Sequence, residues 1–206
     1  EARYRLGLIH EAHGDWAAAR KELEAALASY KEIDDRMNQV LSTLELDQGA
    51  LAGNDQAAGQ SLLDGIGTSL GSLNNPVLLA QAALTRTRIH AVRGEAPEAV
   101  AAAEETCAEA GRTKAVIPSI LCGLAKCLVA PPDEAVAAAL SASTRALDSG
   151  LLILHAEADL ALARAYQRAG RVDQAVSKAK LVQETAHRLR LKQVERDATA
   201  LAARSK

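Results

Sequence analysis

Two histidines near the N-terminus are the first residues whose spacing could hold a metal ion. His10 and His13 lie three residues apart, so their side chains would share one face of a helix, and Asp15 follows them. Zinc needs a third and usually a fourth protein ligand, and the sequence indicates none for this pair. We therefore expect no metal site: His10 packs within the fold, and His13 is solvated before a turn.

The three cysteines are the next candidates for chemistry. Cys122 and Cys127 are five residues apart, which would place their side chains about 140° apart around a helix and is not a metal-binding spacing. No histidine or asparagine can be paired with Cys107 to form a nucleophile site. An odd number of cysteines in a helical chain favours free thiols in a reducing compartment. We expect Cys122 and Cys127 to be buried small residues and the protein to be cytoplasmic.

The glycine-rich stretch around Gly65 and Gly67 does not form a phosphate-binding loop. The third glycine is not at the spacing of a dinucleotide-binding motif, and no strand precedes it. The zinc-protease motif H-E-x-x-H is also missing. The sequence therefore predicts a protein that is not an enzyme and that has no cofactor.

The composition predicts an all-α protein. Of the 206 residues 49% are hydrophobic, but 45 are Ala, none is Phe, and aromatic residues make up 2%. Ala is the best helix former, and no stretch alternates apolar and polar residues as a strand would. The net charge of −2 argues against direct nucleic-acid binding, which needs a basic face. No apolar run approaches the length of a membrane-spanning helix and no signal peptide is recognisable, so we expect no membrane association.

A helix-turn-helix unit recurs along the chain, most clearly in residues 6–26. Successive turns are spaced by about 40 residues, and an Ala follows five positions after each turn residue. Such a repeat is the signature of an α-solenoid, in which each helix pair packs on the next. The turn residues are Gly14, Gly53, Gly94, Ala130 and Gly170, and the alanines are Ala19, Ala58, Ala99, Ala135 and Ala175.

The first and fifth units carry a more specific pattern. The matching residues are Leu6, Gly7, His10, Ala19 and Leu23 in the first unit, and Leu162, Ala163, Tyr166, Ala175 and Ala179 in the fifth. The pattern resembles the tetratricopeptide (TPR) repeat, L-G-x2-Y followed by A-x3-F. The three middle units match it less well, because Glu45, Arg86 and Cys122 stand at the usual Leu position. The period is also longer than that of the family, which is roughly 34 residues.

The resemblance implies an α-α superhelix, a TPR-like solenoid whose first helices line a concave groove, with Trp16 at the aromatic position after the turn. We expect a single domain over residues 1–206, with repeats at about 1–34, 35–73, 74–112, 113–150 and 151–190 and a capping helix at 191–204. The chain starts inside a helix and without Met, so we expect a piece of a longer protein. Long, Ala-rich arrays of this kind resemble those attached to bacterial serine/threonine kinases and large ATPase-type transcriptional activators.

Charged residues fall on the groove side of the first helices. Arg88 and Arg164 suggest an acidic or carboxylate-bearing ligand, although Leu8 stands where the family's carboxylate clamp needs an Asn. The alternative, which we favour, is an ordinary solvated concave face. Apolar inward positions include Leu84, Leu124 and Leu160. The polar groove positions, read from helix register, are Tyr4, Glu11, Asp47, Arg88, Arg164, Gln167 and Arg168.

The function expected from these features is a non-catalytic protein–protein interaction scaffold, the TPR-like region of a larger bacterial signalling or regulatory protein. The alternative is a sensing module that binds a peptide or a small acidic molecule in the groove. Expected partners are a protein, a peptide or another domain of the same chain. Self-association is a further possibility, because the first repeat has no visible cap.

Overall fold

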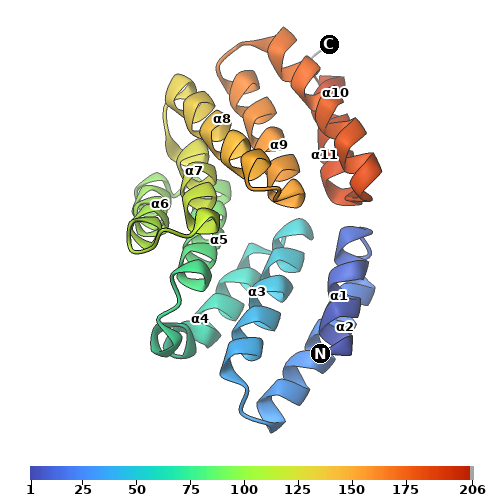
Figure 1. Cartoon of the computed structure of the whole chain (residues 1–206), viewed down its shortest axis with the longest axis vertical. Coiled ribbons are helices and arrows are strands. Elements are labelled where there is room, and N and C mark those ends of the chain that lie inside the picture. The colour runs from blue at the N-terminus through green and yellow to red at the C-terminus, as the bar shows by residue number, and fades with distance from the viewer. Residues whose placement is uncertain (205–206) are drawn as a thin grey trace.

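The computed structural model describes residues 1–204, and these residues form an all-α superhelical solenoid of eleven helices (Figure 1). The helices follow one another as antiparallel pairs, and α11 covers the end of the last pair. Their bounds are α1 Ala2–Ala12, α2 Trp16–Glu32, α3 Arg36–Ala52, α4 Gln56–Leu73, α5 Pro76–Arg93, α6 Ala96–Gly111, α7 Val116–Val129, α8 Pro132–Asp148, α9 Leu152–Arg168, α10 Val172–Leu189 and α11 Lys192–Arg204.

The helices form an inner and an outer layer. Each odd-numbered helix contacts the next odd-numbered one, from α1 through α11, as well as its chain neighbours. The even-numbered helices pack mainly against their chain neighbours and cover the outside. The inner layer therefore consists of the first helices of the five pairs together with α11, as the solenoid prediction requires.

The array curves so far that its two ends meet. Figure 1 shows α1 and α11 close together at the two ends of the chain's path. A Cβ atom placed on Gly14, in the turn after α1, would lie 3.4 Å from the guanidinium carbon of Arg196 in α11. The inner helices consequently surround a central space instead of lining an open groove.

The turns show a repeat that is more regular than the sequence suggested. Left-handed φ angles occur at Gly14 (71°), Asn54 (62°) and Gly94 (75°), which are evenly spaced along the chain. The second turn was assigned to Gly53, one residue too early, because Asn can also adopt this conformation. Further left-handed residues, Asp34 and Asn74, are separated by the same interval. The fourth unit alone departs from the pattern, since no residue of its turn at 130–131 has a positive φ.

Most of the small residues after the turns are buried between helices. Ala19, Ala99 and Ala175 are at most 2% exposed. In the second unit Gly59, not the predicted Ala58, is the buried small residue, because the turn is shifted by one position. Asp15 and Asp55 cap the following helices through their side chains, accepting hydrogen bonds from the backbone N–H groups of Ala18 and Ala58.

The expectation of three free thiols is wrong. Cys107 in α6 and Cys122 in α7 form a disulfide bond with an S–S distance of 2.07 Å, whereas Cys127 is free and buried. Sequence spacing could not show this pair because the two residues lie on different helices that face each other. The cytoplasmic location was inferred from free thiols and stays a prediction. Among residues 1–204, no helix has both the length and the apolar character to cross a membrane.

Candidate binding site

A cavity of about 830 Å³ lies at the centre of the array and is called the central cavity below. All five first helices of the pairs and α11 contribute to its lining. Pockets for small ligands commonly measure about 300–1,000 Å³ and combine an apolar wall with a few polar groups. The central cavity has this mixture, because leucines from α5, α7 and α9 line it together with charged side chains from α1, α3, α5, α9 and α11.

The helices in the middle and second half of the chain supply most of the apolar wall. Leu84, Leu124 and Leu160 line the cavity, as their inward register predicted, and each is at most 5% exposed. Leu128 and Ile153 extend this wall and are more exposed, at 36% and 57%. Apolar area that stays exposed inside a cavity is available to a ligand, and burying it is worth about 25 cal/mol per Å².

Three glutamates from distant parts of the chain meet in the cavity. They are Glu11 of α1, Glu45 of α3 and Glu157 of α9. Burial, the charges of Glu45 and Glu157, and a hydrogen bond with Glu45 together raise the pKa of Glu11 to about 9. Burial and the charge of Glu157 raise the pKa of Glu45 to about 7. Glu11 and Glu45 are therefore a carboxylic acid–carboxylate pair that holds a proton near neutral pH.

The two predicted arginines both line the cavity but differ in their contacts. Arg164 donates a hydrogen bond of 2.6 Å to Asp197 of α11, so its charge is balanced within the chain. Arg88 lies close enough to Glu157 to lower that residue's pKa, which burial otherwise raises. Neither arginine stands alone as a positive charge in the cavity.

Trp16 is an aromatic residue on the cavity wall. It lies at the start of α2, and a Cβ atom on Gly49 would come within 3.2 Å of its ring, so the indole packs closely against α3. Its Nε1 atom is buried and has no hydrogen-bond partner. Since this is the only Trp of the chain, its fluorescence reports on the cavity.

The other predicted groove residues do not line the central cavity. Asp47 is 0% exposed and lies between α3 and α4, where a Cβ atom on Gly59 would be 2.6 Å from its Oδ1 atom. Arg168 donates to the backbone carbonyls of Cys127 and Leu128 and so joins α9 to α7. Tyr4 lies next to the glutamate pair, because burial and the charges of Glu45 and Glu11 raise its pKa. Gln167 is half-buried near the end of α9.

Register reasoning missed Glu45, Glu157 and Asp197, all of which line the cavity. In α3 the inward face was assigned to Asp47, but this residue is buried between helices. The assignment was made from helix register, which is wrong for Asp47. Glu45 and Gln48, three residues apart, mark the true inner face, and the amide of Gln48 donates to Glu45 over 2.8 Å.

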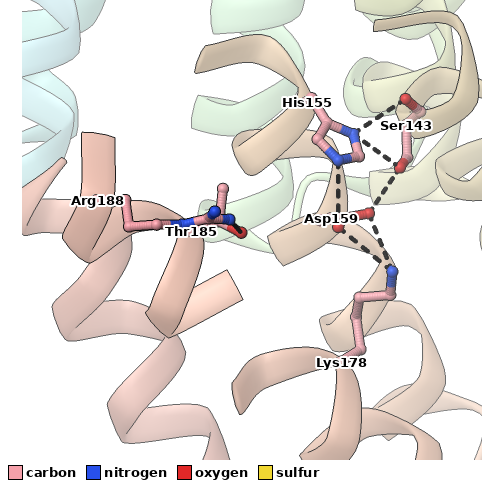
Figure 2. Close-up of polar contacts among 6 residues, drawn as sticks. All are labelled: Ser143, His155, Asp159, Lys178, Thr185 and Arg188. Atoms are coloured by element: carbon pink, nitrogen blue, oxygen red, sulfur yellow. Dashed lines mark hydrogen bonds and ion pairs between the residues drawn. The ribbon is translucent and has the colours of Figure 1, made fainter. Parts of the chain in front are cut away.

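A serine, a histidine and an aspartate meet between α8, α9 and α10, as Figure 2 shows. Ser143 Oγ donates to Asp159 Oδ1 over 2.6 Å, and His155 Nδ1 lies 3.1 Å from the backbone oxygen of Ser143. Lys178 Nζ lies 3.3 Å from both oxygens of Asp159. A catalytic serine donates its proton to a histidine nitrogen, whereas the Ser143 hydroxyl donates to Asp159, and His155 Nδ1 lies 3.2 Å from Ser143 Oγ as well as near its backbone oxygen. The cluster therefore links three helices and is not a catalytic triad.

Residues 67–71 match the hydrolase pattern G-x-S-x-G, but they lie inside α4. The nucleophile of that pattern sits on a sharp turn between a strand and a helix, which exposes its hydroxyl. Ser69 has no such turn, so the match carries no chemistry. Among residues 1–204, no three His, Cys, Asp or Glu side chains are arranged to hold a metal ion, and His10 and His13 form no exception.

No protein-family model matches the chain, and no curated protein sequence matches it. The fold and the central cavity are therefore the observations on which a functional proposal can be built. Of these, the cavity is the more specific, because it brings together charged residues from the beginning, middle and end of the chain.

Proposed function

We propose that this chain is a non-catalytic, TPR-like protein-interaction module that takes a segment of its partner into the central cavity. The expected setting is a larger bacterial signalling or regulatory protein in the cytoplasm. The observation that carries the proposal is the cavity of about 830 Å³ on the concave side of the inner helices. Solenoids use this surface for binding, because it is the largest continuous surface that the repeats create.

The size of the cavity sets the size of the bound segment. Its volume lies within the range of pockets for small ligands, and the two ends of the array close around it. A few residues of an extended peptide fit such a space, whereas a folded domain does not. The same volume supports the second candidate function, the sensing of a small molecule by the cavity alone.

A blocked cavity tests this proposal. Peptides of twelve random residues are selected for binding to the purified chain, and each binder is measured again with Ala91→Phe, which narrows the cavity. Ala101→Phe, on the exposed face of α6, is the matched control. We expect Ala91→Phe to weaken binding by about tenfold or more, which corresponds to about 1.4 kcal/mol or more, because the ring occupies space that the bound segment needs. Ala101→Phe should have no effect.

Trp16 fluorescence provides an independent readout. A segment that enters the cavity changes the surroundings of this side chain, so emission should shift on titration with a selected peptide. The proposal is rejected if no peptide is selected, or if every binder tolerates Ala91→Phe. Small molecules that shift the emission when no peptide does would favour the sensing function.

A further inference from the structure

The glutamates of the central cavity have no basic partner in ion-pair contact. Within residues 1–204, neither Glu11, Glu45 nor Glu157 forms an ion pair with a Lys or Arg side chain, and the only side-chain hydrogen bond to Glu45 from a nitrogen comes from Gln48. These residues come from α1, α3 and α9 and line the same cavity. The fold thus assembles carboxyl groups that a single helix could not bring together.

The charges along the cavity wall leave an acidic surplus. Arg164 is neutralised by Asp197, whereas Arg88, the other arginine of the wall, lies near Glu157 without forming an ion pair with it. Three glutamates therefore face one unpaired arginine, and Glu45 lies close enough to Glu11 for its charge to raise the pKa of Glu11. Two carboxyl groups in contact avoid repulsion only by retaining a proton. An ammonium or guanidinium group offers several N–H donors and can take the place of that proton.

The apolar part of the cavity suits the apolar stem of a lysine or arginine and the peptide residues next to it. Lysine and arginine carry their charge at the end of an apolar stem, which packs along apolar surface. Leu128 and Ile153, which line the same cavity and stay partly exposed, provide that surface. An acidic segment would have to place its own carboxylate beside Glu11 and Glu45, where like charges repel.

We propose that the central cavity binds a peptide segment through a lysine or arginine side chain, whose cationic head lies among the carboxyl groups of Glu11, Glu45 and Glu157. Apolar residues of the peptide on either side of this lysine or arginine contact the apolar wall of the cavity. The inference rests on the proposed function and adds the chemistry of the bound segment. It replaces an acidic ligand, which Arg88 and Arg164 had suggested, by a basic one.

The test uses the random peptides selected on the purified chain. Binders that Ala91→Phe weakens should be enriched in Lys or Arg, and replacing that residue by norleucine should raise Kd about 10- to 100-fold. This is the loss of a charge-assisted hydrogen bond worth about 1.5–3 kcal/mol. Replacement by Glu should weaken binding further. Free cadaverine, which has the amine without the peptide, should bind much more weakly than the peptide.

Neutral variants of the protein give the reciprocal test. Glu11→Gln with Glu45→Gln should reduce the preference for Lys over norleucine to less than threefold. Glu104→Gln, on the exposed face of α6, is the matched control and should leave the preference unchanged. Calorimetry on the unaltered chain provides a test that needs no variant. Binding a cation displaces the proton of the glutamate pair, so the calorimetric enthalpy at pH 8 should differ between phosphate and Tris buffers.

The outcomes separate the inference from the proposed function. Cavity-dependent peptides that are acidic, or that bind equally well with norleucine, overturn the inference and leave the interaction module intact. Peptides that bind without proton release from the unaltered chain also overturn it. Failure to select any cavity-dependent peptide overturns the proposed function and, with it, the basic segment.

Discussion

Two buried aspartates, one in each half of the molecule, differ in whether their carboxyl oxygens have hydrogen-bond partners. Asp159 in α9 is 9% exposed and contacts Ser143 and Lys178 over 2.6 and 3.3 Å. Asp47 in α3 is 0% exposed, and neither of its oxygens accepts a hydrogen bond of normal geometry. Thr85 lies near it and lowers its pKa slightly, but the Thr85 hydroxyl donates to the carbonyl of Gln81. The buried aspartate of the C-terminal half thus has polar partners, whereas the buried aspartate of the N-terminal half has none among the described residues.

The comparison shows that a buried carboxyl group stabilises the fold when it connects helices through its partners, and costs free energy when it has none. Asp159 joins three helices through its partners (Figure 2). Asp47 is a buried acid whose burial raises its pKa to about 7. The cavity glutamates Glu11 and Glu45 belong to the same half as Asp47. The N-terminal half therefore carries three carboxyl groups whose pKa is raised toward neutral pH, against Glu157 in the C-terminal half, and its stability should depend on pH more strongly.

The largest expected effect comes from removing the charge of Asp47. Its pKa in the folded chain lies above the ordinary value of 3.8, so the folded state keeps a proton that the unfolded state has released between pH 4 and 7. Asp47 should therefore lower the free energy of unfolding as pH rises through this window, by about 1.4 kcal/mol per unit, or roughly 4 kcal/mol, in addition to the contributions of Glu11 and Glu45. Asp47→Asn should abolish this loss, so that it is more stable than the unaltered chain at pH 8 and similar at pH 4. Urea unfolding at both pH values measures it.

The control for this prediction is Asp148→Asn, which changes an exposed aspartate at the end of α8. It should leave the pH dependence as it is. Equal slopes for Asp47→Asn and the unaltered chain would show that Asp47 has a partner in solution and that the two halves do not differ in this respect.

The next largest effect is expected from breaking the satisfied cluster. Asp159→Ala leaves Lys178 without its counter-charge and Ser143 without its acceptor. Removing one partner of a buried pair costs about 3–5 kcal/mol, and we expect about 3 because the side chain of Lys178 is 25% exposed. Urea unfolding at pH 7 measures the loss, with Glu184→Ala on the exposed face of α10 as the control. A loss below about 1 kcal/mol would mean that the contacts in Figure 2 contribute no more than a surface pair.

The disulfide between α6 and α7 lies between the two halves and allows their coupling to be tested. Cys107→Ser with Cys122→Ser opens a loop of about 15 residues, which should lower the free energy of unfolding by about 3 kcal/mol. If the halves differ in stability as described, two separate unfolding transitions should appear in the double serine variant at pH 8. A single unchanged transition would indicate that the bond does not form, which thiol titration of the denatured chain checks directly.

The sequence was sufficient to predict the helical array but not its interior. Helices and turns follow from local signals, and α2 and α10 begin at the residues expected, because Gly14 and Gly170 mark the turns before them. The curvature of the whole array is different. The curvature is the sum of many small rotations between successive helices. It brings Glu11 close enough to Glu157 for the charge of Glu157 to raise the pKa of Glu11.

The candidate site was consequently predicted only in part. Glu11, Arg88 and Arg164 line the cavity, as register on their own helices suggested, and binding by them stays a prediction. Glu45 was missed because Asp47, two residues further on, was taken as the inward polar residue. Only the packing of α4 against α3 shows that Asp47 points away from the cavity, toward Gly59.

The smallest expected effect, and the one most specific to Asp47, comes from substituting Gly59. The equivalent residue in the four other units is a buried Ala, namely Ala19, Ala99, Ala135 and Ala175. In α4 a Cβ atom would lie 2.6 Å from Oδ1 of Asp47, so Gly59→Ala alone should destabilise the fold. Asp47→Ala removes the obstacle, and Gly59→Ala in that background should stabilise by about 1 kcal/mol, the helix preference for Ala over Gly. The sign of the Gly59→Ala effect should therefore reverse between the two backgrounds, which a double-mutant cycle by urea unfolding measures. The same sign in both would show that Asp47 does not fill this space, and that the N-terminal half retains glycine for another reason.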